Sequence, residues 1–150
     1  MAPEARKYST RSARRVTFSV LVIDTSALIA RFTERPSPEA LVRRLDGDPD
    51  WHAPHLVDVE ALHVLRTLVA RGALTPDRAR QAREEIALAT IIRYPHTLLL
   101  DRMWTLRANV TAYDAAFLTL AEALGVPLVT LDAHLGAVPG HRAAVEVFSP

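Results

Sequence analysis

Residues 20–26 read VLVIDTS, and this stretch decides the fold class. Its first four residues are apolar and mostly β-branched, the pattern of a short strand covered on both faces. The polar residues that follow end the strand, and Leu28 to Phe32 is predicted to begin a helix capped by Thr25 or Ser26. A buried strand that passes directly into a helix is typical of α/β proteins with a parallel sheet.

The rest of the chain alternates between helical and strand patterns. Apolar residues recur every three or four positions over 56–71, which indicates an amphipathic helix ending at Gly72. Thr75 caps a helix expected to reach about Ile92, and Thr111 caps one that ends at Gly125. A helical piece is expected at 39–45 and strands at 51–54, 126–131 and 143–148, whereas 98–104 fits no single element. The alternation predicts a layered α/β domain with a mainly parallel sheet.

Length and composition limit the class of protein. A chain of 150 residues, 49% hydrophobic and 23% charged, makes one globular domain. It contains no cysteine, which excludes disulfides, thiolate zinc sites and cysteine nucleophiles. The apolar run before Asp24 is far shorter than the roughly 20 residues that cross a membrane. We therefore expect a cytoplasmic protein with no membrane partner.

Charge is distributed unevenly along the chain. Residues 1–19 hold five basic residues and one acidic residue, a net +4, whereas residues 20–150 hold thirteen basic and sixteen acidic residues, a net −3. We interpret residues 1–18 as a flexible basic extension and residues 19–150 as the domain. The acidic body argues against nucleic-acid binding by charge alone.

Four acidic residues are expected at one edge of the sheet. Asp24 and Asp132 each follow a predicted strand, while Glu60 and Asp114 lie near the starts of predicted helices. Ligands of open parallel sheets bind at the carboxyl ends of the strands. If the strands are parallel neighbours, all four carboxylates face one cleft.

Such a cluster requires a counter-charge. Two unit charges about 4 Å apart repel by roughly 4 kcal/mol at an effective dielectric near 20. Taken singly, each acid also has a structural interpretation, as a helix cap, a first-turn acid or a turn residue. Their combined placement favours a site for a hard divalent cation, with Mg²⁺ the expected ion and Mn²⁺ its substitute.

Other chemistries find little support. The histidines His52, His55, His134 and His141 lack the His-Glu-x-x-His spacing of a zinc site, and His63 is either a packed residue or a proton shuttle. There is no glycine-rich phosphate loop, and no histidine and acid partner for a serine nucleophile is evident.

Two phosphate-handling classes of protein share a strand-end aspartate. A phosphorylated receiver domain needs a lysine late in the chain, but the only lysine here is Lys7. A haloacid dehalogenase-type phosphatase needs Asp-x-Asp, and residues 24–26 read DTS. Both interpretations therefore lack an essential residue.

Four blocks of sequence together resemble a known family. They read VIDTSAL at 22–28, VDVE at 57–60, NVTAYDAA at 109–116 and LVTLD at 128–132. In this order they resemble PIN-domain ribonucleases, specifically the VapC toxins of bacterial type II toxin–antitoxin systems. The basic extension departs from that family, whose members often begin almost at the first strand.

The resemblance implies a PIN-like three-layer α/β/α sandwich with roles for particular residues. Asp24 and Asp132 would be the main Mg²⁺ or Mn²⁺ ligands, Asp114 a direct or water-mediated ligand, and Glu60 the support of a second ion or of a water. The hydroxyls beside the acids would fix ligand geometry or meet a phosphate oxygen, and two further residues would form a polar wall. The hydroxyl residues are Thr25, Ser26 and Thr130, and the wall residues are Asn109 and Arg107.

The resemblance also implies an activity and partners. It implies a metal-dependent endoribonuclease that cleaves structured cellular RNA (tRNA or rRNA), leaves a 5′-phosphate and a 3′-hydroxyl, and inhibits translation. A cognate VapB-type antitoxin would place a basic segment near the carboxylates, and the chain would form a homodimer. Apolar grooves between the helices at 56–71 and 76–92 would be the binding surface. An inactive PIN scaffold that binds RNA or protein without cleavage remains the alternative.

Overall fold

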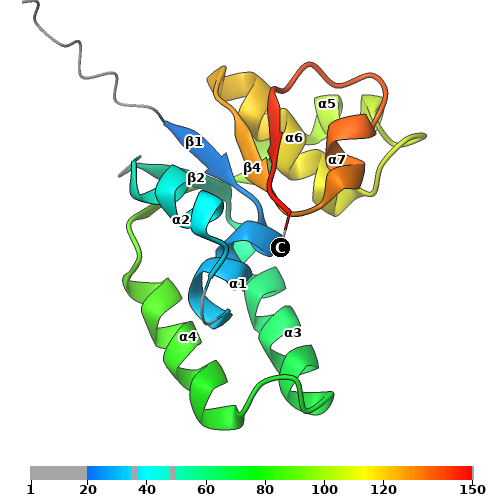
Figure 1. The fold of residues 1–150 in the computed structure, drawn as a ribbon. Coiled ribbons are helices and arrows are strands. Elements are labelled where there is room, and N and C mark those ends of the chain that lie inside the picture. Colours follow the sequence, from blue (N-terminus) through cyan, green and yellow to red (C-terminus); the bar gives the residue numbers. More distant parts are fainter. Residues whose placement is uncertain (1–19, 35–36, 48–49, 150) are drawn as a thin grey trace, which may run out of the picture.

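The computed structural model describes residues 20–34, 37–47 and 50–149. The extension expected at residues 1–18 lies outside the described residues. The described chain forms a five-stranded sheet, flanked by helices, whose strands pair in parallel in the order β3-β2-β1-β4-β5 (Figure 1). The strands are β1 (Leu21–Ile23), β2 (Trp51–Pro54), β3 (Ile91–Tyr94), β4 (Leu128–Thr130) and β5 (Val145–Val147). The expected α/β sandwich with a parallel sheet is confirmed.

The strand order reverses beside β1. The chain adds β2 and β3 on one side of β1, then returns to add β4 and β5 on the other. Val22 is thus paired with His52 on one side and with Leu128 on the other. A crevice forms at the carboxyl ends of the strands at such a reversal, because the connections leave in opposite directions. The fold therefore places its natural ligand site beyond the ends of β1 and β4.

Helices cover the sheet and extend beyond it. α6 packs on β1, β2 and β4, α1 lies against β4, and the long helices α3 and α4 pack together and against α1. Figure 1 shows α3 and α4 side by side, projecting away from the sheet. The helices are α1 (Thr25–Thr33), α2 (Glu39–Asp46), α3 (Leu56–Ala70), α4 (Pro76–Leu88), α5 (Leu100–Thr105), α6 (Ala112–Leu124) and α7 (Ala133–Ala137), with a 3₁₀ turn η1 (His96–Leu99).

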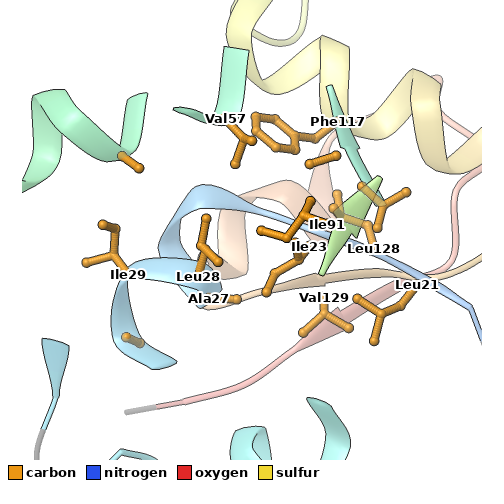
Figure 2. Packing of buried hydrophobic residues seen from close by; sticks show 14 of the residues in the cluster. Leu21, Ile23, Ala27, Leu28, Ile29, Val57, Ile91, Phe117, Leu128 and Val129 are labelled. Atoms are coloured by element: carbon orange, nitrogen blue, oxygen red, sulfur yellow. The ribbon is translucent and has the colours of Figure 1, made fainter. Parts of the chain in front are cut away.

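The hydrophobic core surrounds β1. Leu21, Val22 and Ile23 are fully buried, as the apolar run predicts. Figure 2 shows side chains from several helices around this strand, among them Leu28 from α1 and Phe117 from α6. Burial of each large apolar side chain contributes about 1.5–3 kcal/mol. This packing makes the carboxyl end of β1 a rigid base for the residues that follow.

Helix caps follow the sequence at two places and depart from it at a third. Thr75 and Thr111 accept hydrogen bonds from the backbone N–H groups of Arg78 and Asp114, both at 3.2 Å. The cap of α1 is Asp24, whose side chain accepts the Ser26 N–H at 3.4 Å. The expectation that Thr25 or Ser26 caps this helix is wrong, because helical geometry already begins at Thr25.

Three elements differ from the expected ones: α4, β3 and α7. α4 ends at Leu88 and does not continue to Ile92, because the chain becomes extended at Ala89 and then pairs with β2 over four residues. The β-branched pair Ile91-Ile92 suits that strand. The short helix α7 was not expected; Asp132 caps it and its Leu135 is buried. Within the described residues, no helix is long and apolar enough to span a membrane.

Candidate active site

One cavity of about 710 Å³ lies at the carboxyl ends of β1 and β4. All four predicted acids line it: Asp24 follows β1, Asp132 follows β4, Glu60 comes from α3 and Asp114 from α6. The prediction that these residues face one cleft agrees with their positions. Since they come from four parts of the sequence, only the fold brings them together.

Asp24 is the most enclosed of the four, with 6% of its surface exposed. The hydroxyls of Ser26 and Thr130 both donate to its Oδ2, at 2.6 and 2.7 Å. Hydrogen bonds of this length between a hydroxyl and a carboxylate are short and strong. Asp24 is therefore held in one orientation by two neighbours, one from α1 and one from β4.

Glu60 is tied to the start of α1. The Thr25 hydroxyl donates to Glu60 Oε2 at 2.6 Å. Burial raises the pKa of Glu60 above its ordinary value, the Thr25 hydrogen bond opposes this, and the charges of Asp24 and Asp114 raise it further. Burial is thus the main cause of the shift, and the charges of Asp24 and Asp114 act in the same direction.

Asp114 sits in the first turn of α6. Its Oδ2 accepts the Thr111 hydroxyl proton at 2.8 Å, while its own N–H donates back to Thr111. Burial raises the pKa of Asp114, the Thr111 hydrogen bond lowers it, the charges of Asp24 and Asp132 raise it, and His134 lowers it slightly. Asp114 thus serves as part of a helix cap and as a wall of the cavity.

Asp132 is the exposed member of the group. Its backbone N–H donates to the Thr130 hydroxyl at 3.0 Å, and its Oδ1 accepts the His134 N–H at 2.8 Å, which caps α7. The His134 backbone N–H thus holds the Asp132 side chain through Oδ1. Its exposure is consistent with its place in the turn between β4 and α7.

The donor set suits a hard divalent cation, although the side chains are spread apart. Carboxylate oxygens are the ligands that Mg²⁺ and Mn²⁺ prefer. As the side chains lie, no three acidic or histidine residues of the described chain are close enough together to hold one ion. Hydroxyl groups engage three of the four carboxylates, and mutual repulsion favours their separation. A bound cation would remove that repulsion.

The predicted hydroxyl residues all contact the acids. Thr25 binds Glu60, and Ser26 and Thr130 bind Asp24. Ser26 Oγ also lies 3.1 Å from Thr130 Oγ1 and accepts the Leu131 N–H at 2.9 Å. These bonds connect the ends of β1 and β4 across the point where the strand order reverses.

The predicted polar wall is not at the cavity. Asn109 Nδ2 donates to the Pro139 carbonyl at 3.1 Å, and Arg107 donates to the Trp104 carbonyl and covers the Trp104 ring. Neither Asn109 nor Arg107 lines the cavity. Asn109 and Arg107 are close to Thr111 in sequence but do not lie beside the acids, because the chain turns before α6 begins.

Sequence reasoning missed an apolar part of the cavity. Val59 and Tyr113 line it, each directly preceding one of the acids, and Ile29 and Val64 contribute further surface. His63, which the sequence left open, also lines the cavity. The position of Val59 and Tyr113 directly before Glu60 and Asp114 could have indicated that they line the cavity. An apolar residue on a helix, however, is ordinarily assigned to the core.

Comparison with known proteins places this geometry in a family. The PIN domain family model matches residues 21–140. Ribonuclease VapC1 of Mycobacterium tuberculosis is 38% identical over 120 residues, covering 79% of this chain and 90% of that protein. Ribonuclease VapC9 of the same organism is 38% identical over 116 residues, covering 77% of this chain and 88% of that protein.

A solved structure agrees at the level of the fold. VapBC2 from Rickettsia felis, bound to a DNA fragment from their promoter, matches with a TM-score of 0.61 at 14% identity. The match covers 85% of this chain and 97% of that chain. The family model and the relatives agree with the parallel sheet and the carboxylate cavity. The chain therefore belongs to the PIN-domain family, within its VapC group.

Proposed function

We propose that this chain is a Mg²⁺-dependent endoribonuclease toxin that acts in the cytoplasm and inhibits translation by cleaving structured RNA, either tRNA or rRNA. The observation that carries the proposal is the convergence of four carboxylates on one cavity at the reversal of the strand order. The names of the VapC relatives support the reaction class. The expected products carry a 5′-phosphate and a 3′-hydroxyl.

The proposed metal ligands are Asp24 and Asp132, with Asp114 as a direct or water-mediated ligand and Glu60 orienting water or supporting a second ion. A divalent cation at these oxygens would lower the pKa of a bound water and offset negative charge on the phosphate. The chain's own part is to hold the carboxylates. The Thr130 hydroxyl donates to the Asp24 carboxylate and accepts the backbone N–H of Asp132.

Incubation of purified protein with total RNA in Mg²⁺ or Mn²⁺ tests the activity. We expect discrete cleavage that Asp24→Asn abolishes, and sequencing of RNA 5′ ends after induction in cells would identify the target. If RNA stays intact in both ions, or if Asp24→Asn cleaves as wild type does, the nuclease proposal is wrong. RNA binding without cleavage in a divalent-ion titration would instead support an inactive scaffold.

We also propose a VapB-type antitoxin as the partner, seated between α3 and α4. A groove of about 550 Å³ lies there, with apolar side chains that include Leu62, Leu65 and Val69, and arginines that include Arg66 and Arg80. Leu62 is half exposed, which suits a residue that a partner covers. From this groove, a basic segment of the antitoxin would extend to the carboxylates. A homodimer is the expected state of the chain alone.

Leu62→Glu tests the partner surface. We expect it to weaken inhibition by the co-expressed antitoxin and to leave cleavage by the free toxin unchanged. Native mass spectrometry of the free toxin reports the expected dimer separately. An antitoxin that inhibits the Leu62→Glu variant as well as it inhibits wild type would place the partner elsewhere.

A further inference from the structure

Glu60 differs from the three aspartates of the cavity in how its carboxylate is held. Asp24, Asp114 and Asp132 each accept a hydrogen bond from a residue two or three positions away in sequence, so the local turn orients them. The Glu60 carboxylate accepts its hydrogen bond from Thr25, 35 residues away. The position of Glu60 in the cavity therefore depends on where the start of α3 lies.

The start of α3 is held by the edge strand β3. The N-cap residue of α3, His55, makes no side-chain hydrogen bond to the helix, unlike the capping residues of α4 and α6. Its backbone N–H donates instead to the carbonyl of Tyr94 at 2.9 Å. Arg93 of the same strand donates to both carboxylate oxygens of Asp58, in the first turn of α3, at 2.7 and 2.8 Å.

The Arg93–Asp58 pair has the geometry of an anchor. Arg93 Nη1 also donates to the Ile91 carbonyl at 3.0 Å, so the guanidinium is held by its own strand. A planar guanidinium bound to two carboxylate oxygens fixes orientation as well as distance. Successive helical residues are rotated by about 100°, so Asp58 and Glu60 lie about 200° apart around α3. Asp58 accordingly lines a separate cavity of about 200 Å³ between α3 and α4, whereas Glu60 lines the cavity of the four acids.

We propose that Arg93 is a positioning residue for Glu60, which acts through Asp58 by holding the start of α3 against the sheet. This inference rests on the proposed ribonuclease function and adds to it a residue that does not line the cavity. Two contacts hold α3 on opposite sides, Thr25 at Glu60 and Arg93 at Asp58. Without the second contact, the start of α3 is free to shift, and Glu60 moves relative to the three aspartates.

Substitutions of the pair test its effect on cleavage. Arg93→Leu and Asp58→Asn each break the pair, and both variants should fold because the two side chains are partly exposed. We expect each variant, and their combination, to lower kcat by a similar factor of about 10–100-fold with KM little changed, the usual cost of losing a group that orients a metal-site residue. Glu122→Gln is the matched control, since Glu122 accepts two hydrogen bonds from Arg102 and neither lines the cavity. It should cleave at the wild-type rate per folded molecule.

Combination with Glu60→Gln shows whether Arg93 acts through Glu60. Glu60 is not one of the two proposed principal ligands, so Glu60→Gln should retain cleavage that is measurable in single turnover with excess enzyme. Substitutions that act through one another are non-additive, whereas the effects of independent substitutions add as free energies. We expect Arg93→Leu to cost no further rate in the Glu60→Gln background.

Hydrogen–deuterium exchange gives a readout that does not depend on cleavage. We expect Arg93→Leu to speed exchange at the start of α3, over residues 56–64, and to leave the start of α6 as in wild type. Glu122→Gln should leave exchange at the start of α3 unchanged. Faster exchange throughout the chain in Arg93→Leu would mean a global loss of stability and would count against the proposal.

The outcomes separate this inference from the proposed function. If wild type cleaves RNA and Arg93→Leu cleaves equally well, or loses the same factor with and without Glu60→Gln, Arg93 does not position Glu60 and the ribonuclease stands. A change confined to KM would make Arg93 an RNA contact, and unchanged exchange at the start of α3 would remove the anchor; either result overturns the inference. If wild type cleaves nothing in Mg²⁺ or Mn²⁺, both proposals are wrong.

Discussion

Thr130 Oγ1 donates a hydrogen bond to Asp24 Oδ2 at 2.7 Å, across 106 residues of sequence and between two adjacent parallel strands. The same oxygen accepts the N–H of Asp132 at 3.0 Å. Thr130 itself is fully buried. One hydroxyl group therefore sets the relative position of the two acids that follow β1 and β4.

Removal of this hydroxyl should uncouple the two acids. Thr130→Val keeps the branched shape but leaves the Asp24 carboxylate with Ser26 alone, through its hydroxyl and its backbone N–H. Loss of a group that orients ligands commonly costs about 10–100-fold in metal affinity or activity. We expect a fall of that size in kcat/KM and in Mg²⁺ affinity measured by calorimetry. Thr130→Ser retains the hydroxyl and serves as the control. Wild-type values for Thr130→Val would show that Ser26 suffices.

Divalent cations should stabilise the folded protein. A ligand that binds only the folded state at 100 times its Kd adds about 2.7 kcal/mol to the free energy of unfolding. We expect Mg²⁺ or Mn²⁺ to raise the Tm of wild type and to have little effect on Asp24→Asn. Calorimetric melts in EDTA and in increasing Mg²⁺ measure this. Equal Tm values for wild type with and without the ions would contradict a metal site.

Without metal, the acids should oppose one another. The pKa values of Glu60 and Asp114 are raised in the folded state, chiefly by burial. The folded protein then binds these two protons more tightly than the unfolded chain does. The contribution of Glu60 and Asp114 to stability is therefore highest at low pH and falls as pH rises above the ordinary values of 4.5 and 3.8.

Neutral substitutions of Glu60 and Asp114 should remove this loss of folding stability at neutral pH. We expect Glu60→Gln and Asp114→Asn to raise the Tm of the metal-free protein by a few degrees at neutral pH, while the gain disappears in acid. Urea unfolding in EDTA between acidic and neutral pH measures the difference. A lower Tm at neutral pH for both variants would show that hydrogen bonds to Thr25 and Thr111 outweigh the repulsion.

Asp24→Asn and Asp132→Asn should separate catalysis from folding. Each removes a proposed principal ligand, so we expect cleavage to fall by several orders of magnitude while the Tm without metal changes little or rises. Gel-based cleavage assays and melts on the same samples test this. A loss of several degrees for Asp132→Asn would assign Asp132 a structural role as the cap of α7.

Glu122 should stabilise the fold when it is ionised, in contrast to Glu60 and Asp114. Its enclosed carboxylate accepts two hydrogen bonds from Arg102, at 2.8 and 3.0 Å, and one from the Arg142 N–H at 2.7 Å. The Arg102 hydrogen bonds lower its pKa, so its stabilising effect is present above the ordinary value of 4.5 and is lost as pH falls through the folded pKa.

Glu122→Gln should therefore destabilise the fold without touching the site. Loss of a charged acceptor for several donors typically costs about 1–3 kcal/mol. We expect a lower Tm at neutral pH, a smaller difference in acid, and an unchanged cleavage rate per folded molecule. A variant with wild-type Tm but impaired cleavage would reverse this assignment.

Local sequence predicted much of the fold. Short patterns predict the buried strand, which the structure places at Leu21–Ile23, the Thr111 cap, and the helix end at Gly125, whose φ is +65°. The four acids were identifiable because each occupies a strand end or a helix start. Their meeting in one cavity depends on the strand order, which local patterns do not encode.

The misplaced elements depend on partners remote in sequence. Residues 89–92 follow a helical pattern without a break as strong as proline, yet pairing with β2 makes Ile91–Tyr94 a strand. Asn109 is close in sequence to the acids but binds the Pro139 carbonyl. Tyr113 was overlooked because an exposed aromatic becomes meaningful only when the cavity beside it is known.

The reversal of strand order also has a consequence during synthesis. Asp24 emerges from the ribosome before Thr130 and Asp132, the residues that lie beside it once the chain has folded. A nascent or truncated polypeptide therefore has an incomplete set of carboxylates. If the four carboxylates act together as proposed, a polypeptide that ends before Asp132 is expected not to cleave RNA.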